Sequence, residues 1–259
     1  MPHLSPALPF LAIATAVTLA SAVGAQPVTV VHDQGETVIE GVPGTVMVTD
    51  WAAFDNLSAL GVPVAGVPGS AVPPYLAGLV PADAATIGSL QEPDVEGIVA
   101  AEPDLVVVAS RSRESYPMLA EFVPTIDMSV DNLDLVEEVK ANLAEYGAIF
   151  GLEERAAALA ASLDAKVDEA REATEGRGTG LVVVTNAGKL GLYGPASRVA
   201  WIYNTLGVPS VFDEVDDSDI GRIFYPYRAL ANDLADFSGI SNRQAMERSV
   251  RSKKPLFQA

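Results

Sequence analysis

The chain has 259 residues, no cysteine and a formal charge of −18, from 34 acidic against 16 basic residues. This acidic balance argues against nucleic-acid binding, which needs a basic face, and it keeps molecules apart by self-repulsion. The lack of cysteine excludes disulfides and cysteine-bound metals, and two histidines, His3 and His32, are too few for a histidine-cluster metal site.

The N-terminal segment predicts a secretion signal. The run "ALPFLAIATAVTLASAVGA" is apolar and ends in small residues, and Val23 and Ala25 fit the positions before a cleavage site. Cleavage there would leave Gln26 as the mature start, and the run is short for a membrane span. No cysteine follows it, so we expect a periplasmic protein without a lipid anchor. An uncleaved anchor is the alternative, because "MPHLSP" carries no Lys or Arg.

Short apolar runs alternate with helical patterns through residues 26–128. The stretch "VTVVHDQGETVIEGVPGTVMVTD" predicts short strands with a turn at Gln34-Gly35. A helix is expected in "WAAFDNLSALG", with Asp50 as its N-cap and Gly61 after its last turn. The other expected elements are strands in "VPVAGVP", "DLVVVAS" and "PTIDMS" and helices in "PDVEGIVAAEP" and "ESYPMLAEFV". The alternation predicts a largely parallel, doubly wound α/β sheet.

A long helical region opens the second half. Apolar residues recur at spacings of three and four from Asn132 to about Ile149, which predicts a helix with one buried face. Gly151 ends this helix, and "EERAAALAASLDAKVDEAREATEG" predicts a second, Ala-rich one. The sequence then predicts a strand in "LVVVTN", a helix in "SRVAWIYNTLG" capped by Ser197 and ended by Gly207, and a strand in "VPSVFDEV".

Two α/β halves with a long helix between them form the predicted organisation. The predicted division is a signal peptide (1–25), an N-terminal lobe (26–128), a bridging helix (129–151), a partial C-terminal lobe (152–221) and an atypical tail (222–259). The tail is basic and polar inside an acidic chain, and no further strand of the "LVVV" kind is expected there. Either it is a genuine solvated tail, or a shift of the reading frame near residues 218–222 has replaced the native ending.

The sequence offers little support for catalysis. It contains no G-x-S-x-G elbow, G-x-G-x-x-G loop or Walker A loop, and a Ser/His/Asp triad would depend on His32. The segment "GRGTG" precedes a strand instead of following one, and "DEVDDSD" is typical of a solvated loop. A secreted α/β hydrolase is therefore the weaker hypothesis.

Two arginines stand just beyond predicted strands. Arg111 follows "LVVVAS", and Arg198 follows "LGLYGPAS" at the start of a predicted helix. Ligands of open α/β sheets bind beyond the carboxyl ends of the strands, and a guanidinium group presents a planar fork of donors to an anion. The pair predicts a cationic gap between the halves. The alternative is that each is a surface arginine paired with a nearby carboxylate.

Several separated segments resemble one known family in order. "MVTDWAAFDNLSALGV", "TIGSLQEPDVEGIVAAEPDLVVVASR", "FVPTID" and "LYGPASRVAWIYNTLGV" are similar to the periplasmic solute-binding proteins of iron–siderophore ABC importers, in particular the ferric catecholate branch. The resemblance covers about residues 28–217 and implies two Rossmann-like α/β lobes bridged by a long α-helix, with the ligand between them. After "VFDEVDDS" the family's further helix, strand and third cleft arginine are not recognisable. We therefore expect an incomplete second lobe, weak binding and marginal stability, and transfer that role to neither Arg222 nor Arg228.

The resemblance also implies roles for single residues. Those implied to line the ligand are Arg111, Arg198, Trp51, Tyr193, Arg113 and Tyr116. The first two would meet the charge of the chelate, the next two would form walls on which catecholates stack, and the last two would lie at the entrance. Glu92 would dock onto the permease.

The function implied by the resemblance is capture of an anionic ferric siderophore and its delivery to an inner-membrane ABC permease with its ATPase. The siderophore would be a ligand and not a cofactor, the protein would supply no metal ligands, and it would act as a monomer. Haem or cobalamin chelates are alternative ligands, and a frame-shifted, inactive remnant is a third possibility.

Overall fold

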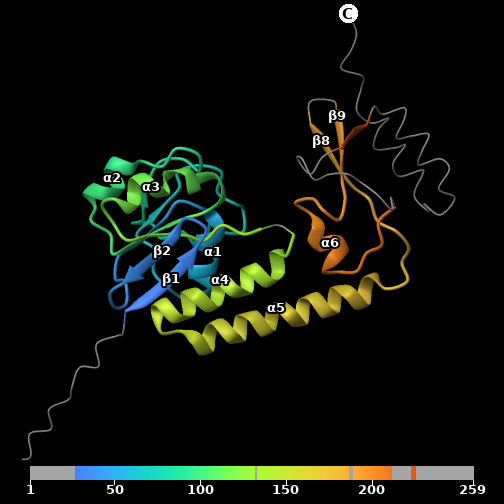
Figure 1. The fold of residues 1–259 in the computed structure, drawn as a ribbon, viewed down its shortest axis with the longest axis horizontal. Helices are drawn as coiled ribbons and strands as arrows, with labels where there is room; N and C mark the ends of the chain where they lie inside the picture. The colour runs from blue at the N-terminus through green and yellow to red at the C-terminus, as the bar shows by residue number, and fades with distance from the viewer. Residues whose placement is uncertain (1–26, 132, 187–188, 212–222, 226–259) are drawn as a thin grey trace, which may run out of the picture.

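The computed structural model describes residues 27–131, 133–186, 189–211 and 223–225. The predicted signal peptide and most of the predicted tail lie outside the described residues. Figure 1 shows a larger N-terminal lobe and a smaller C-terminal lobe, with a long helix running along one side of both. Within the described ranges, no helix combines the length and the apolar character that crossing a bilayer requires.

A five-stranded sheet in the order β5-β4-β3-β6-β7 forms the centre of the N-terminal lobe, and all its strand pairs are parallel. Its strands are β3 (Val46–Val48), β4 (Gly66–Val67), β5 (Ala85–Thr86), β6 (Leu105–Val108) and β7 (Thr125–Asp127). Every residue of β3 and β6 is buried, as expected for strands covered on both faces. The predicted parallel α/β sheet is thus confirmed for this lobe.

Short helices connect these strands. They are α1 (Trp51–Leu60), α2 (Val95–Ala100), the 3-10 helix η1 (Ser110–Ser115) and α3 (Tyr116–Ala120). The ends of α1 are as predicted: the Asp50 carboxylate accepts a hydrogen bond from the Ala52 amide at 2.7 Å, and Gly61 follows at φ 78°. Pro117 lies in the first turn of α3, where a missing amide costs no helical hydrogen bond.

An antiparallel hairpin of β1 (Val28–His32) and β2 (Gly35–Ile39) packs beside the sheet as a separate two-stranded unit. Val30 and Ile39 are buried in the same core cluster as the central strands, whereas Val31 is exposed on the other face. The turn between the two strands lies against η1, because the Gln34 amide group donates to the carbonyl of Arg113. The hairpin tip therefore reaches the carboxyl edge of the parallel sheet.

Two consecutive helices, α4 (Leu135–Phe150) and α5 (Glu153–Thr174), form an antiparallel pair. The buried face of α4, with Tyr146 and Ile149, belongs to the core cluster of the N-terminal lobe. The helices approach closely, since a Cβ atom on Gly147 would lie 2.8 Å from that of Ala156. Figure 1 shows α5 continuing from this lobe to the C-terminal one, so α5 makes the connection. The domain boundaries given above stay a prediction.

The described part of the C-terminal lobe differs from the expected parallel unit. Its sheet has the order β10-β9-β8, with both pairs antiparallel. Its elements are β8 (Val182–Asn186), β9 (Lys189–Tyr193), α6 (Ala200–Asn204) and β10 (Ile223–Tyr225). Of its strands, only β8 was predicted: β9 lies in a segment to which no element was assigned, and β10 lies inside the predicted tail, where no strand of the "LVVV" kind was expected. The strand predicted in "VPSVFDEV" is described only to Val211, with a single bridge between Gly180 and Ser210.

The helix predicted from Ser197 starts later, at Ala200. The Ser197 hydroxyl donates to the carbonyl of Gly194 at 2.7 Å and accepts from the amide of Val199 at 3.3 Å. These bonds hold a turn before the helix instead of capping its first residues. Arg198 therefore lies in that turn.

Candidate functional site

Both cations of the N-terminal lobe lie on one short turn. Arg111 and Arg113 are the only Lys or Arg residues among residues 27–131. They belong to η1, which follows β6 directly at the carboxyl edge of the parallel sheet. The neighbouring strand β3 ends beside them, since the Thr49 amide donates to the carbonyl of Val107 at 3.0 Å. The sequence placed Arg111 beyond a strand end, and the structure agrees.

Arg111 keeps its donors available. Its side chain is exposed, and it forms no hydrogen bond or ion pair with any residue that the structure describes. The positive charge of Arg111 acts on Asp50, the N-cap of α1. Burial raises the pKa of that carboxyl, and the charge of Arg111 lowers it. Arg111 therefore meets solvent with an uncommitted guanidinium group at the edge where α/β sheets bind ligands.

Arg113 is committed to ion pairs. Its guanidinium group lies 3.1 Å from the Asp33 carboxylate and 3.3 Å from that of Asp127. The Asp127 side chain is fully buried, while that of Arg113 is 40% exposed. A charge pair with one buried partner is costly to break, because the remaining carboxylate would lose its compensation. This arrangement gives Arg113 a structural role, and its place at the entrance of a ligand site stays a prediction.

Two aromatic residues of the predicted site are packed against protein. Trp51 is 6% exposed, its indole N–H donates to the carbonyl of Ser70 at 2.8 Å, and its ring meets Phe54 edge-on. Tyr116 is half-buried, with its ring 5.0 Å from that of His32. Little of the Trp51 ring is left for a ligand in this arrangement.

Glu92 lies apart from these residues. Its side chain is exposed in the loop between β5 and α2, and its backbone amide donates a hydrogen bond to the Ser89 hydroxyl at 3.0 Å. This carboxylate is open to a partner, and its role in docking stays a prediction.

In the C-terminal lobe, Arg198 and Tyr193 lie together. Arg198 is exposed in the turn before α6, and its Cζ atom lies 5.8 Å from the centroid of the Tyr193 ring. Tyr193, at the end of β9, is 3% exposed, and its carbonyl accepts from the Tyr203 hydroxyl at 2.8 Å. The contact is a cation–π interaction, which orients the guanidinium group without using its hydrogen-bond donors.

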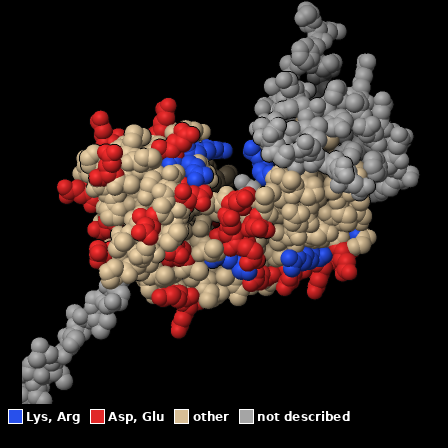
Figure 2. All heavy atoms as spheres, in the orientation of Figure 1, with Lys and Arg blue, Asp and Glu red and all other residues tan. Residues whose placement is uncertain are grey.

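The surface between the two lobes is hollowed. Figure 2 shows Lys or Arg side chains on both sides of this interlobe hollow. The sequence of residues 27–131 holds only two such side chains, Arg111 and Arg113 of η1. In the same view, acidic side chains are scattered over the N-terminal lobe and gather along the side on which α4 and α5 lie, where further Lys or Arg side chains also lie. The chain as a whole is strongly acidic, so the cationic groups at the hollow are a local site of attraction for an anion.

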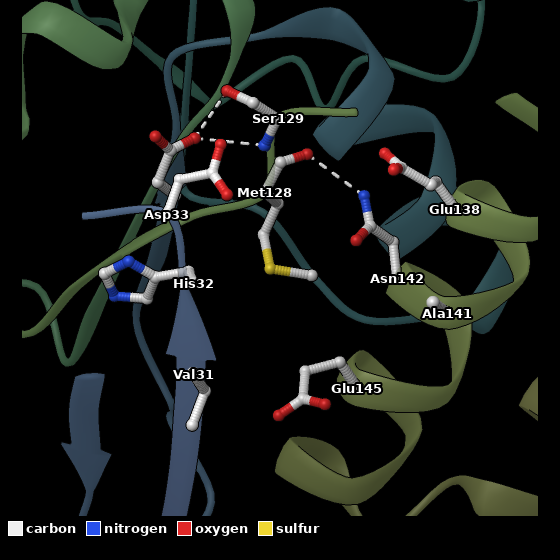
Figure 3. Close-up of a pocket in the computed structure, with 10 residues that line it drawn as sticks. Val31, His32, Asp33, Met128, Ser129, Glu138, Ala141, Asn142 and Glu145 are labelled. Carbon is white, nitrogen blue, oxygen red and sulfur yellow. Dashed lines mark hydrogen bonds between the residues drawn. The ribbon is translucent and has the colours of Figure 1, made fainter. Parts of the chain in front are cut away.

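An acidic pocket of about 290 Å³ lies beside η1 (Figure 3). It is lined by Val31, His32, Asp33, Asp127, Met128, Ser129, Glu138, Ala141, Asn142 and Glu145. In Figure 3 the α4 side chains point toward β1 and the segment after β7, and the Asn142 amide donates to the carbonyl of Met128 at 3.0 Å. Such a lining repels an anion, so the attraction next to it is confined to the arginine turn.

Burial changes two titrations in this pocket. It raises the pKa of Glu145, and it lowers the pKa of His32 although Asp127 and Asp33 act in the opposite direction. His32 is thus biased toward its neutral form. Among the residues that the structure describes, no three His, Cys, Asp or Glu side chains are grouped to hold a metal ion.

Sequence reasoning missed the residues that hold η1 in place. Asp127 is the last residue of β7, Ser129 lies two residues beyond it, and Gln34 lies at the hairpin tip. The rule that singled out Arg111, polar residues at the carboxyl end of a buried strand, applies equally to Asp127. The contact from Gln34 could not be found in this way, because it depends on how the hairpin packs.

A comparison with family profiles matches residues 46–222 to one described as periplasmic binding protein. The petrobactin-binding protein YclQ of Bacillus subtilis is 32% identical over 244 residues, which cover 87% of this chain and 77% of the relative. The ferric-anguibactin-binding protein FatB of Vibrio anguillarum is 31% identical over 202 residues, which cover 76% of this chain and 63% of FatB.

Solved structures share the fold. The crystal structure of YclQ superposes with a TM-score of 0.75 at 30% identity, covering 80% of this chain and 74% of that one. The periplasmic catecholate-siderophore binding protein VctP from Vibrio cholerae superposes with a TM-score of 0.73 at 25% identity, covering 80% and 75% of the two chains. These structures agree with an α/β architecture in two lobes.

Proposed function

This chain belongs to the periplasmic binding protein family, and on that premise we propose that it captures an anionic, catecholate-type ferric siderophore and delivers it to an ABC importer. The observation that carries the proposal is the state of Arg111. It is exposed at the carboxyl edge of the parallel sheet, and it is uncommitted to any described residue. An anion at the interlobe hollow would satisfy its donors.

Charge complementarity supplies the affinity in this proposal. A guanidinium and an anionic oxygen at ~4 Å, with an effective dielectric of about 20, attract by ~4 kcal/mol before the cost of desolvation. Arg111 from one lobe and Arg198 from the other would share the ligand's charge. Two cations on facing walls repel each other without an anion, so binding also removes that repulsion. The acidic surroundings exclude competing contacts elsewhere on the surface.

The relatives' names support an iron chelate as the ligand. The names of YclQ, FatB and VctP refer to petrobactin, ferric anguibactin and a catecholate siderophore. None of these three names refers to haem or cobalamin. The siderophore hypothesis is therefore favoured over the other chelates. Because YclQ and FatB extend beyond the part that this chain matches, the whole activity is inferred from the matched part.

No covalent step belongs to this function. The iron arrives already coordinated, so the protein supplies donors to the outside of the chelate and not ligands to the metal. We propose that the protein acts as a monomer in the periplasm, and that exposed carboxylates such as Glu92 meet the permease.

Intrinsic tryptophan fluorescence tests the proposal with a panel of ferric complexes. The expected result is quenching by ferric catecholates, including ferric petrobactin, and none by neutral ferric hydroxamates, because only the former carry negative charge at their surface. Equal binding of both classes would remove charge as the basis of recognition. Tight binding of haem or cobalamin with no response to any ferric siderophore would favour those alternatives.

A further inference from the structure

The turn that carries Arg111 contains a strained backbone position. Ser110 has φ 51°, in the left-handed region that residues other than glycine rarely adopt. Such a conformation persists only when neighbouring contacts fix it. Here the Ser110 amide donates to the Ser129 hydroxyl at 2.8 Å, and Ser129 lies on the segment after β7. A residue just beyond the neighbouring strand β7 therefore holds the residue that precedes Arg111.

Asp127 connects both sides of Arg111. One carboxylate oxygen accepts from the amide of Ser129, at 3.0 Å, and from its hydroxyl. The other oxygen lies 3.3 Å from Nε of Arg113 and accepts from the Gln34 amide group at 3.2 Å. Through Ser129 this carboxylate reaches the position before Arg111, and through Arg113 it reaches the position two residues later. Its side chain is fully buried, so water does not replace these contacts.

A second support lies under the same turn. The hydroxyls of Thr49 and Ser112 are 2.6 Å apart and buried, and Ser112 also bonds to the backbone of Ala109. This support fixes η1 to the end of β3. The Thr49–Ser112 contact involves neither Ser110 nor Arg113. The orientation of Arg111 therefore depends on the contacts of Asp127, which reach Ser110 and Arg113 on either side of it.

We infer that Asp127 is a positioning residue for Arg111: its buried carboxylate fixes Ser110 through Ser129 and Arg113 directly, so that the guanidinium group is presented in one orientation to an anionic ligand. The inference rests on the proposed function, because it takes Arg111 as a ligand contact. The gain is preorganisation, since a fixed donor loses less freedom on binding. Asp127 itself need not touch the ligand.

The test is a double-mutant cycle on ligand affinity with Asp127→Asn and Arg111→Ala, using ferric petrobactin or the ferric catecholate of the panel that binds most tightly. Asparagine keeps the shape of the side chain and removes its charge. We expect Asp127→Asn to weaken binding about tenfold when Arg111 is present and less than about twofold when Arg111 is alanine. Each variant is first checked by circular dichroism to be folded at the temperature of the binding assay.

Asp104→Asn is the matched control. The Asp104 carboxylate also accepts two backbone amides, from Gly44 at 2.9 Å and Thr45 at 2.7 Å, but it lies at the opposite, amino edge of the same sheet. We expect this variant to change stability without changing affinity. A loss of affinity equal to that of Asp127→Asn would mean that the effect is general destabilisation, and it would overturn the inference.

Ser129→Ala keeps the test decisive if Asp127→Asn fails to fold. It removes only the hydroxyl that joins Asp127 to Ser110, and we expect a loss of about threefold that again disappears without Arg111. Losses that add fully in the double variants overturn the inference and leave the proposed function intact. If Arg111→Ala binds the ligand as tightly as the wild type, the proposed role of Arg111 is wrong, and the inference fails with it.

Discussion

The two lobes present their arginines in different ways. In the N-terminal lobe, Arg111 lies in a turn that buried polar contacts join to the ends of both neighbouring strands. The Thr49–Ser112 pair joins it to β3, and Asp127 joins it to β7. In the C-terminal lobe, Arg198 lies in a turn where Ser197 bonds to Gly194 and Val199, and the Tyr193 ring is the contact of its guanidinium group among the residues that the structure describes. In the parallel sheet, adjacent strands end at the same edge, whereas in the antiparallel sheet β10-β9-β8 adjacent strands end at opposite edges. Under the proposed function, we expect the first lobe to offer a rigid donor and the second an adaptable one.

Replacement of each arginine by alanine tests most directly whether the two lobes differ in how they bind the ligand. We expect Arg111→Ala to cost about 2–5 kcal/mol of ferric catecholate binding, and Arg198→Ala to cost about half as much because more freedom is lost when it binds. Fluorescence titration measures both. Arg177→Ala, which removes an exposed arginine after α5, is the control and should leave affinity unchanged. A larger effect at Arg198 would reverse the assignment of rigid and adaptable donors.

Paired serine variants sharpen the contrast between the two turns. Ser112→Ala removes a buried hydroxyl and leaves the Ala109 amide without its partner, so we expect a loss of about 1–3 kcal/mol in the free energy of unfolding. Ser197→Ala removes a hydroxyl with purely local bonds, and we expect about 1 kcal/mol or less. Urea denaturation measures the two values. Equal losses would show that the turns are anchored alike.

The aromatic ring beside Arg198 gives a smaller effect. Tyr193→Leu keeps an apolar side chain but removes the cation–π contact, and we expect siderophore binding to weaken by about 0.5–1 kcal/mol. The same variant in the Arg198→Ala background should have no further effect on affinity. An unchanged loss in that background would mean that Tyr193 acts on the ligand directly, as a wall of the cleft.

The smallest expected effect concerns pH and Asp50. Burial raises the pKa of this carboxyl in the folded state, with Arg111 opposing the rise. The folded protein therefore holds the proton more tightly, so the contribution of Asp50 to stability is present at low pH and declines as pH rises from the ordinary aspartate pKa through the raised one. Asp50→Asn should flatten this part of the stability profile, measured by urea denaturation at several pH values. Asp94→Asn, at the exposed cap of α2, is the control, and an identical flattening there would contradict the assignment.

The sequence predicted the first lobe well, because its signals are local. The apolar run of β6, the Asp50 cap and the Gly61 stop each act within a few residues of the element that they define. The same locality placed Arg111 at a strand end. The contacts that hold the turn around Arg111 could not be predicted, since Asp127 ends the neighbouring strand β7, Ser129 follows it, and their contacts depend on sheet order.

The second lobe was predicted less well for a physical reason. The segment that forms β9 contains glycine and lysine and lacks a strong apolar run, so its strand forms through pairing with β8. The start of the helix after Arg198 was misplaced, because Ser197 bonds backward to Gly194. Trp51 is 6% exposed and bonds to the carbonyl of Ser70, so sequence position alone could not decide between a core and a cleft residue, and its role as a wall stays a prediction.

A crystal structure of the protein with a bound ferric catecholate tests the central claim most directly. We predict that the guanidinium groups of Arg111 and Arg198 both lie within about 3 Å of oxygen atoms of a single chelate in the interlobe hollow. Two guanidinium groups on separate outer surfaces, with the chelate bound elsewhere, would contradict the account.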